Sequence, residues 1–180
     1  MIIFYTVAGI VVSVLVVAVI AVVVLASMKP DEFRIERSAT INASPEKVLP
    51  LVNDFHNWPG WSPWEKLDPN LQRTFDGPAS GKGAIYAWNG NDKVGQGRME
   101  ILESAPTQLD IKLDFIKPFA SSNRTEFVLH PQGDATVVTW TMTGPSQFIT
   151  KLMGVFFSMD KMVGKDFEKG LAQLKAAAEK

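Results

Sequence analysis

The sequence predicts an α+β domain in which a curved antiparallel sheet of seven strands surrounds one long C-terminal helix, preceded by a single transmembrane helix. Three observations predict this architecture: a continuously apolar N-terminal run, a series of short segments separated by turn residues, and a C-terminal stretch with apolar residues at helical spacing. A chain of 180 residues has room for one ordinary domain and a short additional element.

The first segment, residues 1–28, is expected to cross a membrane. Almost every residue from Ile2 to Ala26 is apolar, and a helix needs about 20 such residues to span a bilayer core. A cleaved signal peptide is the alternative, with a small-residue site at Val24-Leu25-Ala26. A signal peptide would show a basic leader and an apolar stretch of only about 7 to 15 residues. A buried core helix is disfavoured, because every face of the segment is apolar.

Residues 29–32 are the expected linker between this helix and the soluble domain. Pro30 ends the helix, because proline cannot donate to a continuing helical ladder. Lys29, Arg34 and Arg37 follow the span, whereas no Lys or Arg precedes it. The positive-inside rule therefore favours a single-pass membrane protein with its soluble domain in the cytoplasm.

Composition excludes several classes of function. The net charge is -1, so the chain lacks the large basic surface that nucleic acids require. There is no cysteine, which excludes thiolate nucleophiles and Cys-ligated zinc. His56 and His130 are too widely separated to form a recognisable metal motif. No Gly-x-Ser-x-Gly elbow is present. We therefore expect no metal and no cofactor, and we assign no catalytic residue.

The soluble domain begins with a predicted strand over residues 33–41, where apolar and polar residues alternate. Arg37 falls on the inward face, which indicates either a position near an open end of the sheet or a bulge that shifts the register. Ser44 followed by Pro45 predicts the start of a helix. The stretch 54–64 is rich in proline and aromatic residues and predicts a second short helix and a tight loop.

The rest of the domain reads as a meander of strands followed by one helix. Glycine, proline and asparagine signals separate the strands, and short turns between consecutive strands indicate antiparallel pairing. From about Gln147 to Lys180, apolar residues at spacings of three and four predict one long amphipathic helix that packs on the sheet. The expected strands are 71–75, 83–89, 95–103, 108–115, 122–130 and 136–143.

Several stretches resemble membrane-anchored members of the polyketide cyclase/dehydrase branch of the START-like (SRPBCC) superfamily. They include Ala43-Ser44-Pro45-Glu46-Lys47-Val48, Trp61-Ser62-Pro63-Trp64, Trp88-Asn89-Gly90-Asn91 and Gly164-Lys165-Asp166-Phe167. The resemblance covers residues 33–180 and implies the helix-grip (START/Bet v 1-like) fold. It does not choose among lipid carriers, receptors, cyclases and ligand sensors, because one fold hosts many functions.

In a helix-grip domain the space between the sheet and the helix is often a cavity, and aromatic walls suit an apolar ligand. We therefore expect a hydrophobic small molecule or lipid to bind there. The predicted ligand contacts are Trp64, Tyr86, Trp88, Phe115, Phe127, Trp140, Met142, Phe156 and Met159.

Three functions stay open at this point. The leading hypothesis is membrane-anchored binding of a hydrophobic small molecule. An enzyme of the polyketide cyclase/dehydrase type is the second, with Arg37, Tyr86 and Glu65 as its plausible titratable groups. A ligand-free protein-interaction module is the third. The segment 152–159 is apolar on nearly every face, which suits either the closing of a cavity or contact with the bilayer.

Overall fold

The computed structural model describes the backbone of residues 2–180 and the side chains from residue 9 onward. Two parts of the chain are each compact by themselves. One consists of the residues up to Glu32 together with Ser146–Met159, and the other of Phe33–Pro145 together with Asp160–Lys180. Met1 belongs to the predicted membrane segment and lies outside the described residues.

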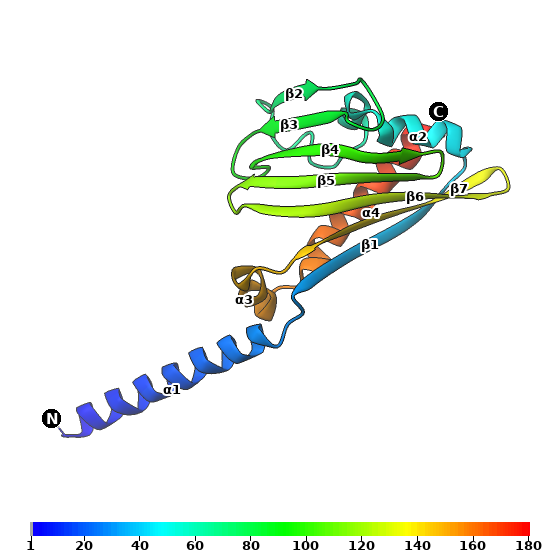
Figure 1. The fold of residues 1–180 in the computed structure, drawn as a ribbon. Coiled ribbons are helices and arrows are strands. Elements are labelled where there is room, and N and C mark those ends of the chain that lie inside the picture. Colours follow the sequence, from blue (N-terminus) through cyan, green and yellow to red (C-terminus); the bar gives the residue numbers. More distant parts are fainter. Residues whose placement is uncertain (1) are drawn as a thin grey trace. The chain divides into compact units, whose positions relative to one another are not determined.

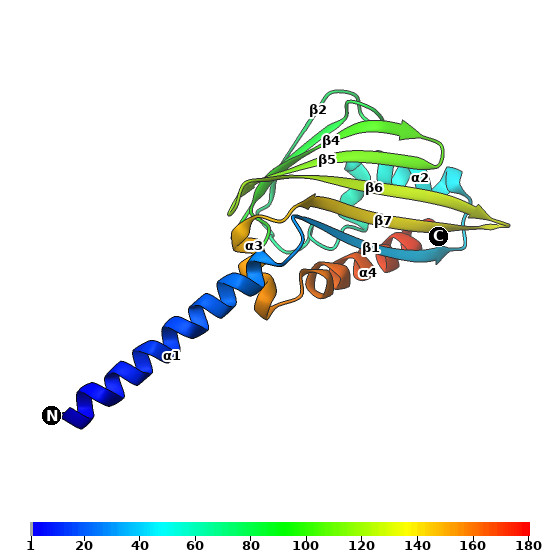
Figure 2. The same cartoon turned by 60° about the horizontal axis from the view of Figure 1, so that its bottom comes forward.

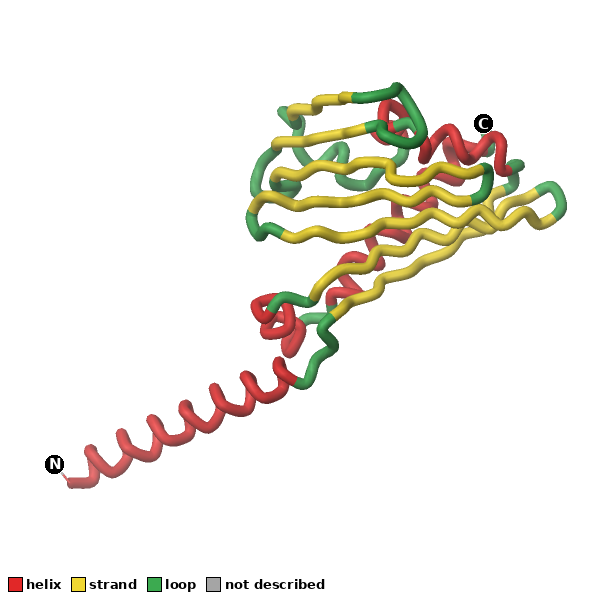
Figure 3. The backbone as a smooth tube through the Cα atoms, viewed as in Figure 1, coloured by secondary structure: helices red, strands yellow, loops and turns green. Residues whose placement is uncertain are grey.

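The larger part is built on a seven-stranded antiparallel sheet (Figure 1). The strand order is β1-β7-β6-β5-β4-β3-β2, so six strands form a meander and the first strand pairs with the last (Figure 3). The predicted sheet is therefore confirmed. The strands are β1 (Glu32–Ile41), β2 (Gln72–Asp76), β3 (Ile85–Asn89), β4 (Gln96–Ala105), β5 (Gln108–Lys117), β6 (Ser121–Gln132) and β7 (Ala135–Pro145).

Helix α4 (Met159–Ala178) runs along one face of this curved sheet (Figure 2). Its buried residues Phe167, Leu171 and Leu174 recur at spacings of four and three, which places them on one side of the helix. The ring of Phe167 stacks on that of Trp140 in β7, with the centroids 4.0 Å apart. Helix and sheet are thus in direct contact at the centre of the domain.

Helix α2 (Pro45–Asn53) and the short 3-10 helix η1 (Phe55–Gly60) lie between β1 and β2 in the chain. Pro45 occupies the first turn of α2, as expected, but the side chain of the N-cap residue Ser44 makes no capping hydrogen bond. Trp58 and Trp61 are buried, and their indole N–H groups donate to the carbonyls of Val52 and Leu51 at 3.0 and 2.8 Å. This aromatic loop is therefore part of the core.

The C-terminal region contains two helices, so the prediction of one helix from 147 to 180 is wrong. Helix α3 (Phe148–Phe156) ends at Phe157, whose backbone is extended with φ -130° and ψ 138°. Ser158 is a residue type favoured at helix N-caps, and Asp160 supplies an acidic group in the first turn of α4. Both residues favour the start of a new helix. The chain therefore breaks into two helices here, although the apolar residues keep their helical spacing.

Arg37 is accommodated without a bulge, because burial along β1 alternates regularly through this position. Its guanidinium links β1 to α4. It donates to the carboxylates of Asp160 (2.9 Å) and Glu168 (2.8 Å) and to the backbone carbonyl of Asp160 (3.0 Å). Gly164 leaves room for it, since a Cβ there would lie 2.0 Å from Nη2. The hydrogen bonds to Asp160 and then to Glu168 raise the pKa of Arg37 above its ordinary value.

The smaller part consists of α1 (Ile2–Ser27), the residues after it, and α3. Within α1, Gly9–Ser27 has a mean hydropathy of 3.3 and is long and apolar enough to cross a membrane by length and composition. Helices α1 and α3 are in contact. Lys151 of α3 forms an ion pair with Asp31, and the backbone N–H of Ser146 donates to the carbonyl of Asp31 at 2.7 Å.

Candidate ligand-binding site

The register of the strands shows which side chains share the inner face of the sheet. In an antiparallel pair, residues directly opposite each other point to the same side. Phe127 of β6 lies opposite Trp140 of β7, and Thr125 lies opposite Met142. Trp88 of β3 lies opposite Gly97 of β4, which in turn lies opposite Phe115 of β5. Two further residues of β6 point inward: Asn123, opposite Leu113 of β5, and Leu129, opposite Val138 of β7.

The centre of this face is filled by aromatic side chains. The ring of Trp140 lies between Phe127, at a centroid distance of 4.9 Å, and Phe167 of α4, at 4.0 Å. Trp61 and Trp64 make T-shaped contacts with it, at centroid distances of 5.6 and 5.7 Å. Phe127 and Trp140 were both predicted as ligand contacts, and their surroundings give both a packing role in the core.

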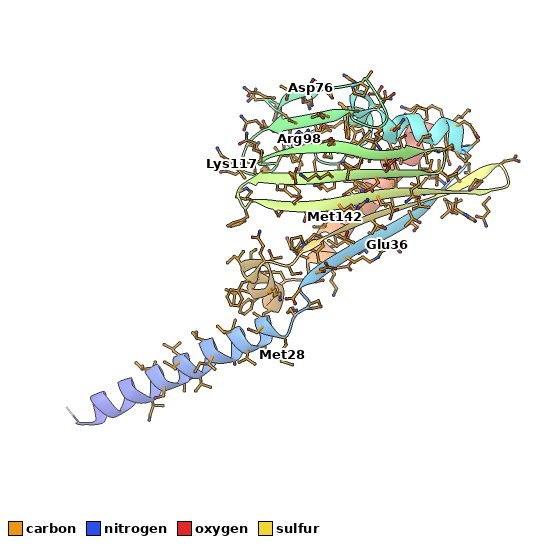
Figure 4. The ribbon with its side chains drawn as sticks, in the orientation of Figure 1. Met28, Glu36, Asp76, Arg98, Lys117 and Met142 are labelled. Atoms are coloured by element: carbon orange, nitrogen blue, oxygen red, sulfur yellow. The ribbon has the colours of Figure 1, made fainter. Side chains whose placement is uncertain are left out.

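Three predicted residues lie toward one end of the face, which we call the less filled end because two of them, Trp88 and Phe115, are only half-buried. Both point to the inner side of the sheet, and their rings are 5.9 Å apart. Met142 is buried on β7 (Figure 4). Gly97 makes room for the indole of Trp88, because a Cβ at that position would lie 2.4 Å from the ring. This end of the concave face therefore offers apolar and aromatic surface that the domain does not fully cover.

Two polar atoms on the same face are buried without a hydrogen-bond partner among the described residues: Oδ1 of Asn123 and Nε1 of Trp140. The amide nitrogen of Asn123 donates to the hydroxyl of Ser121 at 3.1 Å, which leaves its carbonyl oxygen free. The exposed fractions are only 7% for Asn123 and 2% for Trp140. An unsatisfied buried polar group costs about 1–3 kcal/mol, so an acceptor and a donor left open on one face call for an explanation.

The indole N–H of Trp140 points away from Gly170, a residue of α4. A Cβ on Gly170 would lie 2.8 Å from Cζ3 of Trp140, and Cζ3 and Nε1 are on opposite edges of an indole. Along the strands, Trp140 and Asn123 are separated by the row of Thr125 and Met142. The two open groups therefore lie on either side of the buried row that contains Thr125 and Met142.

A buried ionic cluster lies next to Trp88, formed by Glu65, Arg73 and Tyr86. The hydroxyl of Tyr86 donates to Oε1 of Glu65 at 2.6 Å, and Nε of Arg73 donates to Oε2 at 2.7 Å. Arg73 also donates to the backbone carbonyl of Glu65 at 3.1 Å. Glu65 is buried, whereas 30% of the Arg73 side chain is exposed. Both carboxylate oxygens of Glu65 are thus already occupied by donors of the protein.

Burial, and then the hydrogen bond to Glu65, raise the pKa of Tyr86 above its ordinary value, and the bond to Glu65 raises the pKa of Arg73. The folded chain keeps the Tyr86 phenol protonated where the unfolded chain would release its proton. The stability that the Tyr86 phenol contributes is therefore fully present below pH about 10, the ordinary pKa of tyrosine, and is lost as pH rises toward its higher pKa in the folded chain.

We expect the Tyr86→Phe variant to be less stable than the wild type at neutral pH, by a margin that narrows in alkaline solution. The margin narrows because only the wild type loses the Tyr86 contribution above pH about 10. Urea unfolding of the full chain in detergent micelles, followed by tryptophan fluorescence at a series of pH values, measures this margin. A margin that stays constant through the alkaline range would contradict the raised pKa.

The enzyme hypothesis named Arg37, Tyr86 and Glu65 together, and the structure brings only two of them together. Tyr86 and Glu65 share a short hydrogen bond, whereas Arg37 is engaged by Asp160 and Glu168 on α4. Sequence reasoning missed Arg73, although it lies opposite Trp88 in the β2–β3 pair and so shares the inner face. Asn123 was also missed, although it alternates along β6 with the outward residues Ser122 and Arg124 and so lies on the same face as Thr125.

Phe156 and Met159 lie in the smaller compact part and are not grouped with the other predicted contacts. Phe156 is exposed on α3, and Met159 is the half-exposed first residue of α4. A role for these two residues as ligand contacts stays a prediction. Trp64 is half-buried and makes a T-shaped contact with Trp140, and Tyr86 is buried in the ionic cluster.

The two histidines lie outside this face. His56 stacks on Phe75 with the ring centroids 4.1 Å apart, and its Nδ1 lies 2.8 Å from a carboxylate oxygen of Asp54. His130 is exposed on β6. Within residues 2–180, no group of three His, Asp or Glu side chains is placed to hold a metal ion.

A surface hollow of about 270 Å³ is lined by Phe55, His56, Phe75, Asp76, Gly77, Pro78, Ala79, Ala84 and Ile85.

Comparison with known families identifies the domain. Residues 32–179 match the family model described as polyketide cyclase / dehydrase and lipid transport. The chain belongs to this family. The family resemblance found in the sequence is therefore confirmed over residues 32–179, which is nearly the whole predicted domain of this polyketide cyclase/dehydrase family member. No curated protein matches the sequence.

Solved structures show the same fold at low sequence identity. Protein CV1439 from Chromobacterium violaceum aligns with a TM-score of 0.58 and 15% identity, over 84% of this chain and 99% of its own. The KanY protein aligns with a TM-score of 0.59 and 17% identity, over 83% and 99%. Ara h 8.0201 aligns with a TM-score of 0.53 and 13% identity, over 82% and 95%. These similarities confirm the helix-grip fold of this family member.

Proposed function

We propose that this protein binds a hydrophobic small molecule or lipid between its sheet and α4, and that α1 anchors it in a membrane. Its family covers lipid transport as well as cyclase and dehydrase proteins, so a role in hydrophobic ligand binding or cyclisation is supported. The proposed site lies toward the less filled end of the concave face, where the predicted contacts Trp88, Phe115 and Met142 are.

One observation carries this proposal: the buried acceptor Asn123 Oδ1 and the buried donor Trp140 Nε1 have no partner among the described residues. Ligand pockets are mostly apolar and contain a few polar groups that fix orientation. A ligand that satisfied both groups would carry a hydrogen-bond acceptor and a donor on an apolar body. Burial of that body would supply affinity at about 25 cal/mol per Å² of apolar surface.

Catalysis is the second candidate, because Tyr86 and Glu65 are titratable groups beside Trp88. A general acid or base must reach the substrate with a free proton or a free lone pair. Both oxygens of Glu65 already accept hydrogen bonds from Tyr86 and Arg73, and the phenolic proton of Tyr86 is directed at Glu65. This occupancy favours binding over proton transfer, and it gives the cluster a role in holding β2 and β3 to the loop that contains Glu65.

Membrane anchoring rests on α1, whose residues from Gly9 to Ser27 are apolar apart from Ser13 and Ser27, and are almost all exposed. Apolar side chains exposed on all faces of a helix are suited to lipid and not to water. We propose that this helix spans the bilayer with the domain on the cytoplasmic side, because Lys29, Arg34 and Arg37 follow it. A tether of this kind keeps the binding domain close to ligands dissolved in the membrane.

The test of ligand binding is to purify the full chain from membranes, extract what accompanies it and identify it by mass spectrometry. For the Asn123→Ala variant we expect about tenfold weaker retention of the bound compound, the effect of losing one hydrogen bond worth about 1.4 kcal/mol. The free protein should lose little stability, because the substitution also removes an unsatisfied buried acceptor.

The matched control is Ser122→Ala, which alters the neighbouring residue on the outer face of the same strand. This variant should retain the compound at the wild-type level. If wild type, Asn123→Ala and Ser122→Ala all carry the same compounds in the same amounts, the site is elsewhere. If none carries an apolar compound after purification in several detergents, the protein-interaction module becomes the better hypothesis.

A further inference from the structure

Helix α3 exposes an unusual surface for a protein in water. None of its nine residues is buried. Ile149, Met153 and Phe156 are exposed at spacings of four and three, which places them on one face of the helix. Phe148 extends this face, and 54% of its surface and 66% of that of Phe156 are accessible. We call Phe148, Ile149, Met153 and Phe156 the apolar face of α3.

The opposite side of α3 is turned toward the end of α1. Lys151 forms an ion pair with Asp31, and Gly154 lies close to Lys29, since a Cβ there would be 3.8 Å from the lysine side chain. The polar contacts of α3 are therefore made with the residues that directly follow the membrane-spanning segment. A helix on the surface of a soluble protein shows the reverse arrangement, with its apolar stripe against the protein and its polar face outward.

The position of α3 identifies what covers this face. Helix α3 contacts α1, and the contacts given above involve Lys29 and Asp31, just beyond the last residue of the span at Ser27. The end of a transmembrane helix lies at the boundary between hydrocarbon and headgroups. Amphipathic helices lie in this boundary with their apolar face about 5–10 Å into the lipid and with basic residues on the polar side. Phe148 and Phe156 supply the bulky side chains, and Lys29 and Lys151 supply the charges.

We propose that α3 lies in the plane of the membrane surface, with its apolar face inserted among the lipids of the bilayer that α1 spans. This inference rests on the proposed membrane anchor and adds a second attachment point from a distant part of the sequence.

The experiment uses depth-dependent fluorescence quenching in the full chain reconstituted into phosphatidylcholine vesicles. The chain has no cysteine, so each single-cysteine variant carries one fluorophore at a defined position. The labelled variants are Met153→Cys and Phe156→Cys on the apolar face, Val17→Cys within the span, and Lys169→Cys on the exposed side of α4. All four side chains are exposed, so the substitutions leave the packing of the protein undisturbed.

Nitroxides attached near the headgroup end of the lipid chains should quench the labels at 153 and 156 strongly and the label at 169 weakly. Nitroxides near the methyl end should quench the label at 17 most strongly. If the label at 17 is quenched but those at 153 and 156 behave like the label at 169, the anchor stands and the inference about α3 is wrong. If the label at 17 is not quenched, the anchor itself fails, and the inference fails with it.

Discussion

The Trp140→Ala variant is expected to lose about 3–5 kcal/mol of unfolding free energy, the usual cost of removing a large buried aromatic side chain. Trp140 is 2% exposed and lies between Phe127 and Phe167, so it joins the sheet to α4. It also makes T-shaped contacts with Trp61 and Trp64. Truncation to alanine would leave a cavity bounded by four aromatic rings that cannot all move into it.

Urea unfolding of the full chain in micelles, followed by circular dichroism, measures this loss. The matched variant is Trp88→Ala, since Trp88 is half-buried at the less filled end and its ring pairs with those of Tyr86 and Phe115, both on strands of the sheet. It should lose clearly less stability than Trp140→Ala. Equal losses for the two variants would show that the aromatic centre is not the core of the domain. Loss of ligand in Trp140→Ala is not diagnostic, because unfolding alone would cause it.

The order of the elements could be predicted because the signals are local. Turn residues such as Gln132-Gly133-Asp134 separate the strands, and Gly133 adopts a positive φ of 62° in the turn between β6 and β7. Alternation within each strand identifies its buried face without knowledge of its neighbours. The same rule placed Arg37 correctly on the inner face. It could not reveal the partners of Arg37, because Asp160 and Glu168 are more than a hundred residues away in the chain.

The break between α3 and α4 was missed because apolar spacing continues through it. Phe156, Met159 and Val163 keep intervals of three and four, so periodicity alone predicts one helix. The signal that could have found the break is Ser158, a favoured N-cap residue followed by Asp160 in the next turn. The excess of apolar residues in 152–159, noticed in the sequence, corresponds to the exposed apolar side chains of α3 and Phe157.

The candidate site could be predicted only in part, because its polar features depend on pairing between strands. The aromatic residues of the concave face follow from alternation, but whether an aromatic ring packs in the core or faces a ligand depends on what α4 places against it. The same limit applies to hydrogen bonds. Asn123 and Trp140 are recognised as unsatisfied only when every neighbour is known, and Glu65, Arg73 and Tyr86 come from three separate segments.

Replacement of Glu65 by leucine is expected to cost about 3 kcal/mol, toward the lower end of the range for breaking a buried ion pair. The change leaves the buried hydroxyl of Tyr86 without its acceptor and the guanidinium of Arg73 without its carboxylate. The cost is moderated because 30% of the Arg73 side chain is exposed and water can solvate part of its charge. Leucine removes the acceptor while it keeps much of the side-chain volume, so the loss reports the cluster and not a cavity.

Two further variants separate the charge from the hydrogen bond. Glu65→Gln keeps an acceptor for Tyr86 but removes the charge that faces Arg73, and it should lose less stability than Glu65→Leu. The double variant Glu65→Leu with Tyr86→Phe removes both ends of the buried hydrogen bond. It should recover part of the loss, because no unsatisfied hydroxyl remains. Urea unfolding of the three variants and the wild type gives these differences directly. A Glu65→Leu variant as stable as the wild type would mean that the cluster contributes nothing to the attachment of β2 and β3, and would leave Glu65 free for a role in proton transfer.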